Sequence, residues 1–176
     1  MLCVPLYYLE VWLSPPVADT ERHIKEMAQL GFRHIELEGI GEDNINYLYE
    51  HRSRIATALD THHCTVPMFC VVLPQLGSGK TAERAKSLAL FEKGCATAKV
   101  LGAEGVLDNG PLLPLTYPLD MPVMRHYNDE VLGKLLPPRN LNWADYWLEL
   151  TTTYREACAI AAHYGLAYHL HPCEGA

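Results

Sequence analysis

A nearly continuous apolar run at residues 65–73 limits the folds that are open to this chain. The run is TVPMFCVVL, and its polar and apolar residues do not alternate. Such runs are typical of parallel strands that are buried on both faces, whereas a strand with one face in water alternates with a period of two. We therefore predict that residues 65–73 form a strand inside a parallel sheet.

Strand-like and helix-like segments alternate along the rest of the chain. The expected strands are 6–13, 32–38, 65–73, 105–107 and 166–171. The expected helices run from residue 19 or 20 to 31, and over 44–60, 82–101 and 143–164. This order is typical of an α/β fold with a parallel sheet. The 176 residues are expected to form one domain, residues 1–176.

Charge and hydropathy exclude several classes of partner. The formal net charge is −7, which disfavours binding to a nucleic-acid backbone because such proteins present a basic face. The sequence contains no transmembrane run. The apolar N-terminus carries Glu10 and lacks a basic leader, so it is a poor signal peptide. We expect a cytoplasmic protein with neither a nucleic-acid nor a membrane partner.

Cysteine spacing gives no sign of a disulfide framework or a zinc motif. The six cysteines are Cys3, Cys64, Cys70, Cys95, Cys158 and Cys173. They are scattered and form no C-x-x-C pair, so we expect reduced thiols that mostly fill the core.

Two histidines mark the last expected strand. His169 and His171 are two residues apart and therefore share one face, while Tyr168 faces the covering helix. Pro172 ends the pairing because it has no N–H, and Glu174 follows. This pattern fits a metal or sugar site. It fits equally well two histidines that are hydrogen-bonded in a polar barrel interior.

The strand at 32–38 carries a second set of titratable groups. His34, Glu36 and Glu38 share one face, and Ile35 and Leu37 point the opposite way, toward the helices. Three such groups on one strand face fit a barrel lumen near its working end or a solvated sheet face. The residues alone leave both interpretations open.

Residues 108–142 form a long proline-rich segment after the fourth strand. It contains six prolines: Pro111, Pro114, Pro118, Pro122, Pro137 and Pro138. Loops of this length inside a compact domain are usually functional lids or insertions. We expect a loop or lid at the same edge of the sheet as His171.

The segment 74–81, PQLGSGKT, is similar to a phosphate-binding loop but departs from the pattern G-x-x-x-x-G-K-[ST]. Pro74 occupies the place of the first glycine and offers no N–H, which argues against an NTPase. Backbone N–H groups at the start of the next helix, together with Lys80, would still suit one phosphate of a sugar phosphate. A surface loop with a solvated lysine is the alternative.

Three motifs together resemble the xylose isomerase-like TIM barrels, which include sugar phosphate isomerases and epimerases and the AP endonuclease group. Residues 31–37, GFRHIEL, resemble the second strand of that family. Residues 96–106, ATAKVLGAEGV, resemble its third helix and fourth strand, and 157–165 followed by HLHP at 169–172 resembles its fourth helix and fifth strand. The resemblance covers most of the chain.

The resemblance implies a divalent metal, Zn, Mn, Mg or Co, at the C-terminal mouth of the barrel. The family has a glutamate ligand on strand five, often followed two residues later by His-Pro. His171 and Pro172 match the second part, and His169 stands where the glutamate would be. We expect His169 to bind the metal and Glu174 to compensate from the loop for the missing charge.

The activity implied by the resemblance is proton transfer next to a carbonyl, through an enediolate, on a sugar or sugar phosphate. Glu36 matches the acid of strand two and is the expected catalytic residue. His171, Glu38 and Lys80 are the expected substrate contacts.

The length departs from the family. A TIM barrel needs eight strands and about 250 residues, and this sequence supplies about five strands and four helices. We expect the N-terminal portion of a parallel (β/α) barrel, whose open edges invite homo-oligomers or a partner that completes it. Such a chain would be a truncated gene product or one that needs a partner.

Three functions follow from these observations. The first is a metal-dependent isomerase or epimerase, or a fragment of one. The second, a non-catalytic sugar-binding or assembly module of the same fold, is favoured by the missing ligands and by His169. The third, an AP-endonuclease-type nuclease, is disfavoured by the acidic charge.

Overall fold

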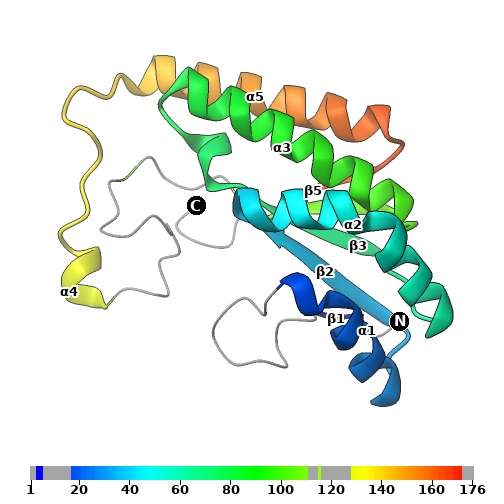
Figure 1. Ribbon diagram of the computed structural model, residues 1–176. Coiled ribbons are helices and arrows are strands. Elements are labelled where there is room, and N and C mark those ends of the chain that lie inside the picture. The colour runs from blue at the N-terminus through cyan, green and yellow to red at the C-terminus, as the bar shows by residue number, and fades with distance from the viewer. Residues whose placement is uncertain (1–2, 6–16, 111–114, 116–127, 172–176) are drawn as a thin grey trace.

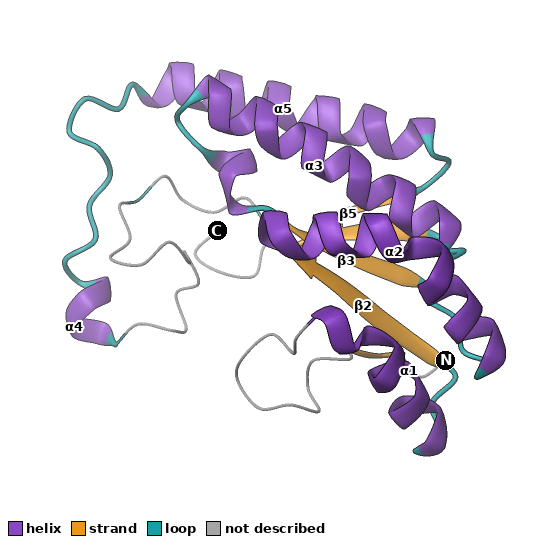
Figure 2. Ribbon diagram, in the orientation of Figure 1, coloured by secondary structure: helices purple, strands orange, loops and turns teal. Residues whose placement is uncertain are grey.

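Five parallel strands form one sheet in the order β1-β2-β3-β4-β5 in the computed structural model, which describes residues 3–5, 17–110, 115 and 128–171. The strands are β1 Cys3–Pro5, β2 His34–Ile40, β3 Met68–Val72, β4 Gly105–Asp108 and β5 Ala167–Leu170. The α-helices are α1 Thr20–Gln29, α2 Gly41–Thr61, α3 Thr81–Val100, α4 Asp129–Leu132 and α5 Trp143–His163. Helices α2, α3 and α5 lie side by side over one face of the sheet (Figures 1 and 2). This confirms the predicted partial parallel (β/α) barrel.

Strand β2 has the predicted alternation of buried and half-buried residues. Ile35 and Leu37 are 0% and 2% exposed and belong to the core under the helices. His34, Glu36 and Glu38 lie on the opposite, inner face and are half-buried. The inner face is therefore the lumen side of a barrel.

Strand β3 is an interior strand, as its apolar run predicts. Phe69 and Val71 pack in the core, and Cys70, which is 1% exposed, lies on the inner face. The strand begins at Met68 rather than at residue 65, because Pro67 has no N–H for the ladder. Its carbonyl instead accepts a hydrogen bond from the Glu104 N–H at 3.0 Å.

Other boundaries differ from those expected. The first strand is Cys3–Pro5, and the predicted 6–13 lies outside the described residues. Helix α2 starts three residues early, at Gly41, whose φ of 74° suits a glycine at a sharp entry from β2. Within the expected loop 108–142, residues 129–132 form helix α4, capped by the side chain of Asn128, which accepts a hydrogen bond from the Val131 N–H. Residues 111–114 and 116–127 of that segment lie outside the described residues, and its predicted role as a lid stays a prediction.

The glycine-rich loop between β3 and α3 is tied to α5. The Tyr146 hydroxyl donates to the Gly77 carbonyl at 2.9 Å in a buried hydrogen bond. The buried Arg84 side chain donates to the Ser78 carbonyl at 2.7 Å and forms an ion pair with Glu149 at 2.6 Å. These contacts hold the loop against two helices.

The described part of the chain has no helix that is long and apolar enough to cross a membrane. Among its cysteines, Cys64, Cys95 and Cys158 are free thiols, as predicted. Strands β1 and β5 are the two edges of the described sheet. Self-association through these edges stays a prediction.

Packing between β2 and α2 depends on Gly39. A Cβ added there would lie 2.3 Å from the Ile45 Cδ1 atom. We expect Gly39→Ala to lower the free energy of unfolding by about 1–3 kcal/mol, as overpacked cores do. Ile45→Val removes the clashing Cδ1, so the alanine should cost less in that background.

Urea unfolding of the wild type, both single variants and the double variant measures this coupling. Gly79→Ala is the matched control, because a Cβ there meets nothing within 4 Å. Equal costs for Gly39→Ala in the wild-type and Ile45→Val backgrounds would contradict the packing argument.

Candidate active site

The inner face of the sheet carries a row of side chains set by the strand register. Glu38 pairs with Cys70, Cys70 with Leu107, and Leu107 with His169. Because all strands are parallel and these residues are paired from strand to strand, they form one continuous row across the inner face. The row places the predicted residues of β2 and β5 on the same face.

Glu36, Glu38 and Cys70 form a cluster at one end of this row. One potential ligand atom from each lies within 4.8 Å of the others, and no other such group of three is found in the described part of the chain. Burial raises the pKa of Glu36, and the nearby His171 partly counteracts that shift. The predicted catalytic acid therefore lies beside two further donors and within electrostatic range of the predicted substrate-contacting histidine.

His171 is attached to the end of β4 at two points. Its backbone N–H donates to the Asp108 carbonyl at 2.8 Å. Its ring Nδ1 lies 3.1 Å from the Asn109 Oδ1 atom, and the Asn109 amide nitrogen donates to Cys70 Sγ at 3.7 Å. Asn109 thus links the histidine of the last strand to the carboxylate–thiol cluster.

His169 lies on the same inner face but apart from this cluster. A Cβ added to Gly105 would lie 3.0 Å from both Cδ2 and Nε2 of the His169 ring, so the ring covers that glycine. Two strand spacings, about 10 Å, separate the backbones of His169 and Cys70, with Leu107 between them. The metal-binding role of His169 stays a prediction, and its expected helper Glu174 lies outside the described residues.

Lys80 is exposed at the start of α3 and has an acidic partner. Its Nζ atom donates to Glu83 at 2.7 Å, and the Ser78 hydroxyl donates to the same carboxylate at 2.6 Å. The hydrogen bond from Lys80 is the main reason that the pKa of Glu83 is lowered. Glu83 therefore occupies the place where a phosphate was expected, and the predicted phosphate contact of Lys80 stays a prediction.

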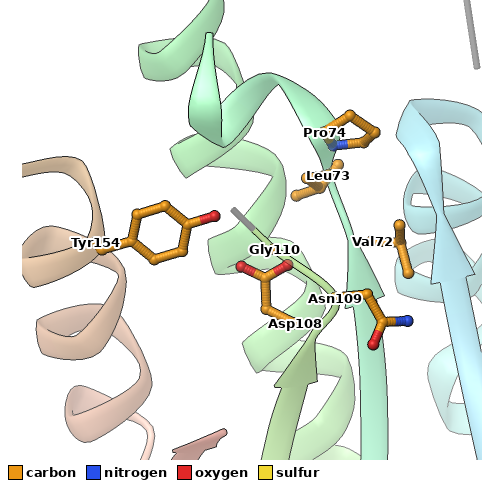
Figure 3. Close-up of a pocket in the computed structure, with 7 residues that line it drawn as sticks. All are labelled: Val72, Leu73, Pro74, Asp108, Asn109, Gly110 and Tyr154. Atoms are coloured by element: carbon orange, nitrogen blue, oxygen red, sulfur yellow. The ribbon is translucent and has the colours of Figure 1, made fainter. Parts of the chain in front are cut away.

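Asp108 is a buried carboxyl group that the sequence did not indicate. It is 2% exposed, and its Oδ2 atom accepts a hydrogen bond from Tyr168 at 2.7 Å, while Tyr154 also hydrogen-bonds to it. Burial raises its pKa to about 6, and the two tyrosines partly counteract this. Figure 3 shows the Asp108 carboxyl directed toward Tyr154 and Asn109 pointing to the other side of the strand.

A shallow hollow adjoins this carboxyl, and it has no room even for a water molecule. It is lined by Val72, Leu73, Pro74, Asp108, Asn109, Gly110 and Tyr154 (Figure 3). The hollow is too tight to admit a sugar. Asp108 therefore supports the strand end from the helix side and is not itself part of the inner face.

No family model and no curated protein matches the sequence. Solved structures match the fold. D-Psicose 3-epimerase from Clostridium cellulolyticum H10, solved with D-tagatose, has a TM-score of 0.63 at 14% identity, over 94% of this chain and 50% of that one. The 3-keto-D-glucoside 4-epimerase of E. coli has a TM-score of 0.63 at 14% identity, over 86% of this chain and 50% of that one. A sugar phosphate isomerase/epimerase from Parabacteroides distasonis has a TM-score of 0.56 at 13% identity, over 96% of this chain and 50% of that one.

The described part of the chain has the fold of about half of such a (β/α) barrel. This confirms the fold that the strand and helix motifs predicted. The chain spans about half the length of each of these barrels. Glu36, Glu38, His169 and His171 accordingly lie on the inner face of such a barrel.

The ionisation of Asp108 makes stability depend on pH. The unfolded chain releases this proton near pH 3.8, whereas the folded chain keeps it to about pH 6, so rising pH in that window favours unfolding. The difference of about two pKa units corresponds to roughly 3 kcal/mol in the free energy of unfolding. This stabilisation of the folded chain is present at pH 3.8 and lost by pH 7. We expect Asp108→Asn to remove this loss.

Urea unfolding at pH 4, 5.5 and 7 measures the effect as the difference between wild type and variant. Asp60→Asn, at an exposed position on α2, is the control for removal of a carboxylate. An identical pH dependence in wild type and Asp108→Asn would show that the carboxyl is not desolvated.

Proposed function

We propose that this chain supplies the first strands of a metal-dependent sugar or sugar-phosphate isomerase or epimerase. The observation that carries the proposal is the half-buried Glu36, which shares the inner side of a barrel fold found in sugar epimerases with His171 and lies within electrostatic range of it. Since the chain spans about half of those barrels, the complete site would combine it with further strands. The reaction class is proton transfer next to a carbonyl.

Glu36 is the proposed acid/base residue. A general base works best when its pKa lies near the working pH, and burial moves the pKa of Glu36 upward, in that direction. A substrate that covers the inner face would exclude more water and extend the same trend. In this position Glu36 would accept the proton from the carbon beside the carbonyl and, in an isomerase, would return it to the neighbouring carbon from the same face. An epimerase would need a second acid/base group on the opposite face, which the further strands of the complete barrel would supply.

His171 and Glu38 are the proposed substrate contacts. His171 is exposed on the inner face at the C-terminal end of its strand, where TIM-barrel sites lie. An imidazole nitrogen and a carboxylate are both suited to sugar hydroxyls. Lys80 would contact a phosphate group only if that phosphate displaced Glu83 from it.

The residues present fit a divalent ion. Glu36, Glu38 and Cys70 offer two carboxylates and a thiol whose ligand atoms lie within 4.8 Å of one another. His169, the donor that the sequence predicted, lies apart from them and is the alternative place for an ion. A thiolate favours Zn²⁺ or Co²⁺ over Mg²⁺, which prefers oxygen ligands. When bound, such an ion supplies positive charge that favours loss of a proton next to a carbonyl.

A non-catalytic sugar-binding or assembly module is the second candidate. It is favoured by His169, which stands where the resemblance places a glutamate, and by the length of the chain relative to the barrels it matches. Measurements of metal binding and of proton exchange distinguish this non-catalytic module from the enzyme.

Proton exchange tests the reaction class. We expect the protein, with a divalent metal, to exchange solvent deuterium into D-fructose or D-psicose at the carbon next to the carbonyl, as followed by ¹H NMR in D₂O. Glu36→Gln should slow this exchange by at least about 100-fold, the usual contribution of a general base. Glu42→Gln, at an exposed position near the start of α2, is the matched control. Exchange that survives Glu36→Gln would remove Glu36 from the mechanism.

Titration calorimetry with Zn²⁺ tests the metal site. We expect one site that Cys70→Ser weakens by about tenfold or more, with Cys158→Ser on the exposed side of α5 as the control. Loss of binding in His169→Ala, with no effect of Cys70→Ser, would place the ion at β5 instead. Absence of binding by the wild type would favour the non-catalytic module.

A further inference from the structure

We propose that Asn109 is a positioning residue that fixes the proton of His171 on Nδ1 and leaves Nε2 as a hydrogen-bond acceptor for the substrate. This inference rests on the proposed function, because it assigns His171 its protonation form in the sugar site. Nothing in the motifs of the sequence pointed to Asn109.

The first step of the argument is the attachment of His171. The Asp108 carbonyl holds its backbone N–H at 2.8 Å, and the Asn109 side chain lies 3.1 Å from its ring Nδ1. Two consecutive residues of the β4 end therefore fix both the main chain and the ring. A histidine at an exposed strand end would otherwise sample several rotamers.

The second step concerns the orientation of the Asn109 amide. Its nitrogen donates to Cys70 Sγ, which leaves Oδ1 directed at the imidazole. An amide oxygen only accepts, so the ring nitrogen that it contacts must carry the hydrogen. The neutral ring is then an Nδ1–H tautomer, and its Nε2 atom bears the free lone pair.

The third step is the rigidity of the strand end that carries Asn109. The preceding residue, Asp108, is held on the helix side by the hydroxyls of Tyr154 and Tyr168. Because neighbouring residues of a strand point to opposite faces, this anchor directs Asn109 to the inner face, as Figure 3 shows. The buried carboxyl thus acts on the site through the placement of Asn109.

The consequence is a division of roles on the inner face. An Nε2 acceptor on the inner face that also carries Glu36 suits a sugar hydroxyl that donates its hydrogen to the ring. With the opposite tautomer the ring would present an N–H and would instead suit a carbonyl oxygen. Asn109 therefore selects which oxygen of the substrate His171 recognises.

Nitrogen NMR of the full chain tests the tautomer directly. Long-range ¹H–¹⁵N spectra of uniformly labelled, metal-free protein are recorded at a pH where the ring is neutral, and His171 is assigned by its absence in His171→Ala. We expect the Nδ1–H pattern in the wild type. Asn109→Ala should shift the ring toward Nε2–H, and Asn109→Asp, which keeps an acceptor oxygen, should retain Nδ1–H.

Asn46→Ala is the matched control, because Asn46 is a half-buried asparagine on α2 that accepts a hydrogen bond from Lys93. It should leave the His171 pattern unchanged. An Nε2–H tautomer in the wild type would overturn the proposal, even if Asn109→Ala failed to fold. An unchanged Nδ1–H pattern in folded Asn109→Ala would overturn it as well. The measurement needs no substrate, so failure of the deuterium exchange tests the proposed function separately.

Discussion

The apolar outer face of β2 and β3 determines where the polar side chains of the inner face lie. Ile35, Leu37 and Phe69 must pack under the helices, since their exposure would cost roughly 1.5–3 kcal/mol each. A strand has a period of two, so burying these residues turns Glu36 and Cys70 inward. A shift of one residue would bury the carboxylates beneath the helices, and the core therefore protects the register of the site.

Strand β4 joins the two sides of the sheet through consecutive residues. Asp108 meets two tyrosines on the helix side, and Asn109 meets Cys70 and His171 on the inner side. A buried carboxyl is expensive unless hydrogen bonds compensate for the lost hydration. The tyrosine hydroxyls provide those bonds, and they also connect α5 and β5 to the end of β4. The residue that supports the strand end, Asp108, and the residue that contacts the candidate site, Asn109, are therefore neighbours in one short segment.

Much of the fold followed from local pattern, whereas the contacts of the site did not. The alternation at 34–38 and the apolar run at 65–73 were enough to predict parallel strands and to place Glu36 and Glu38 together on the face away from the helices. Whether that face was a barrel lumen or a solvated sheet face was left open by the residues alone. Asp108 and Asn109 were missed because their partners are 60 and 62 residues away. Cys70 was hidden in an apolar run, where a thiol resembles any other small buried side chain. Lys80 had the expected loop, but its neighbour Glu83 competes for the anion position.

The hydrogen bond between Gly77 and Tyr146 has a consequence for synthesis of the chain. Its two residues are 69 positions apart. At about 5–20 residues per second, the ribosome needs roughly 3–14 s to make that interval. During this time the loop between β3 and α3 lacks the partner of its buried carbonyl, and Arg84 lacks Glu149. The nascent chain therefore passes through a state in which α2 and α3 are available to cover β2 and β3, while the loop before α3 still lacks its contacts with α5.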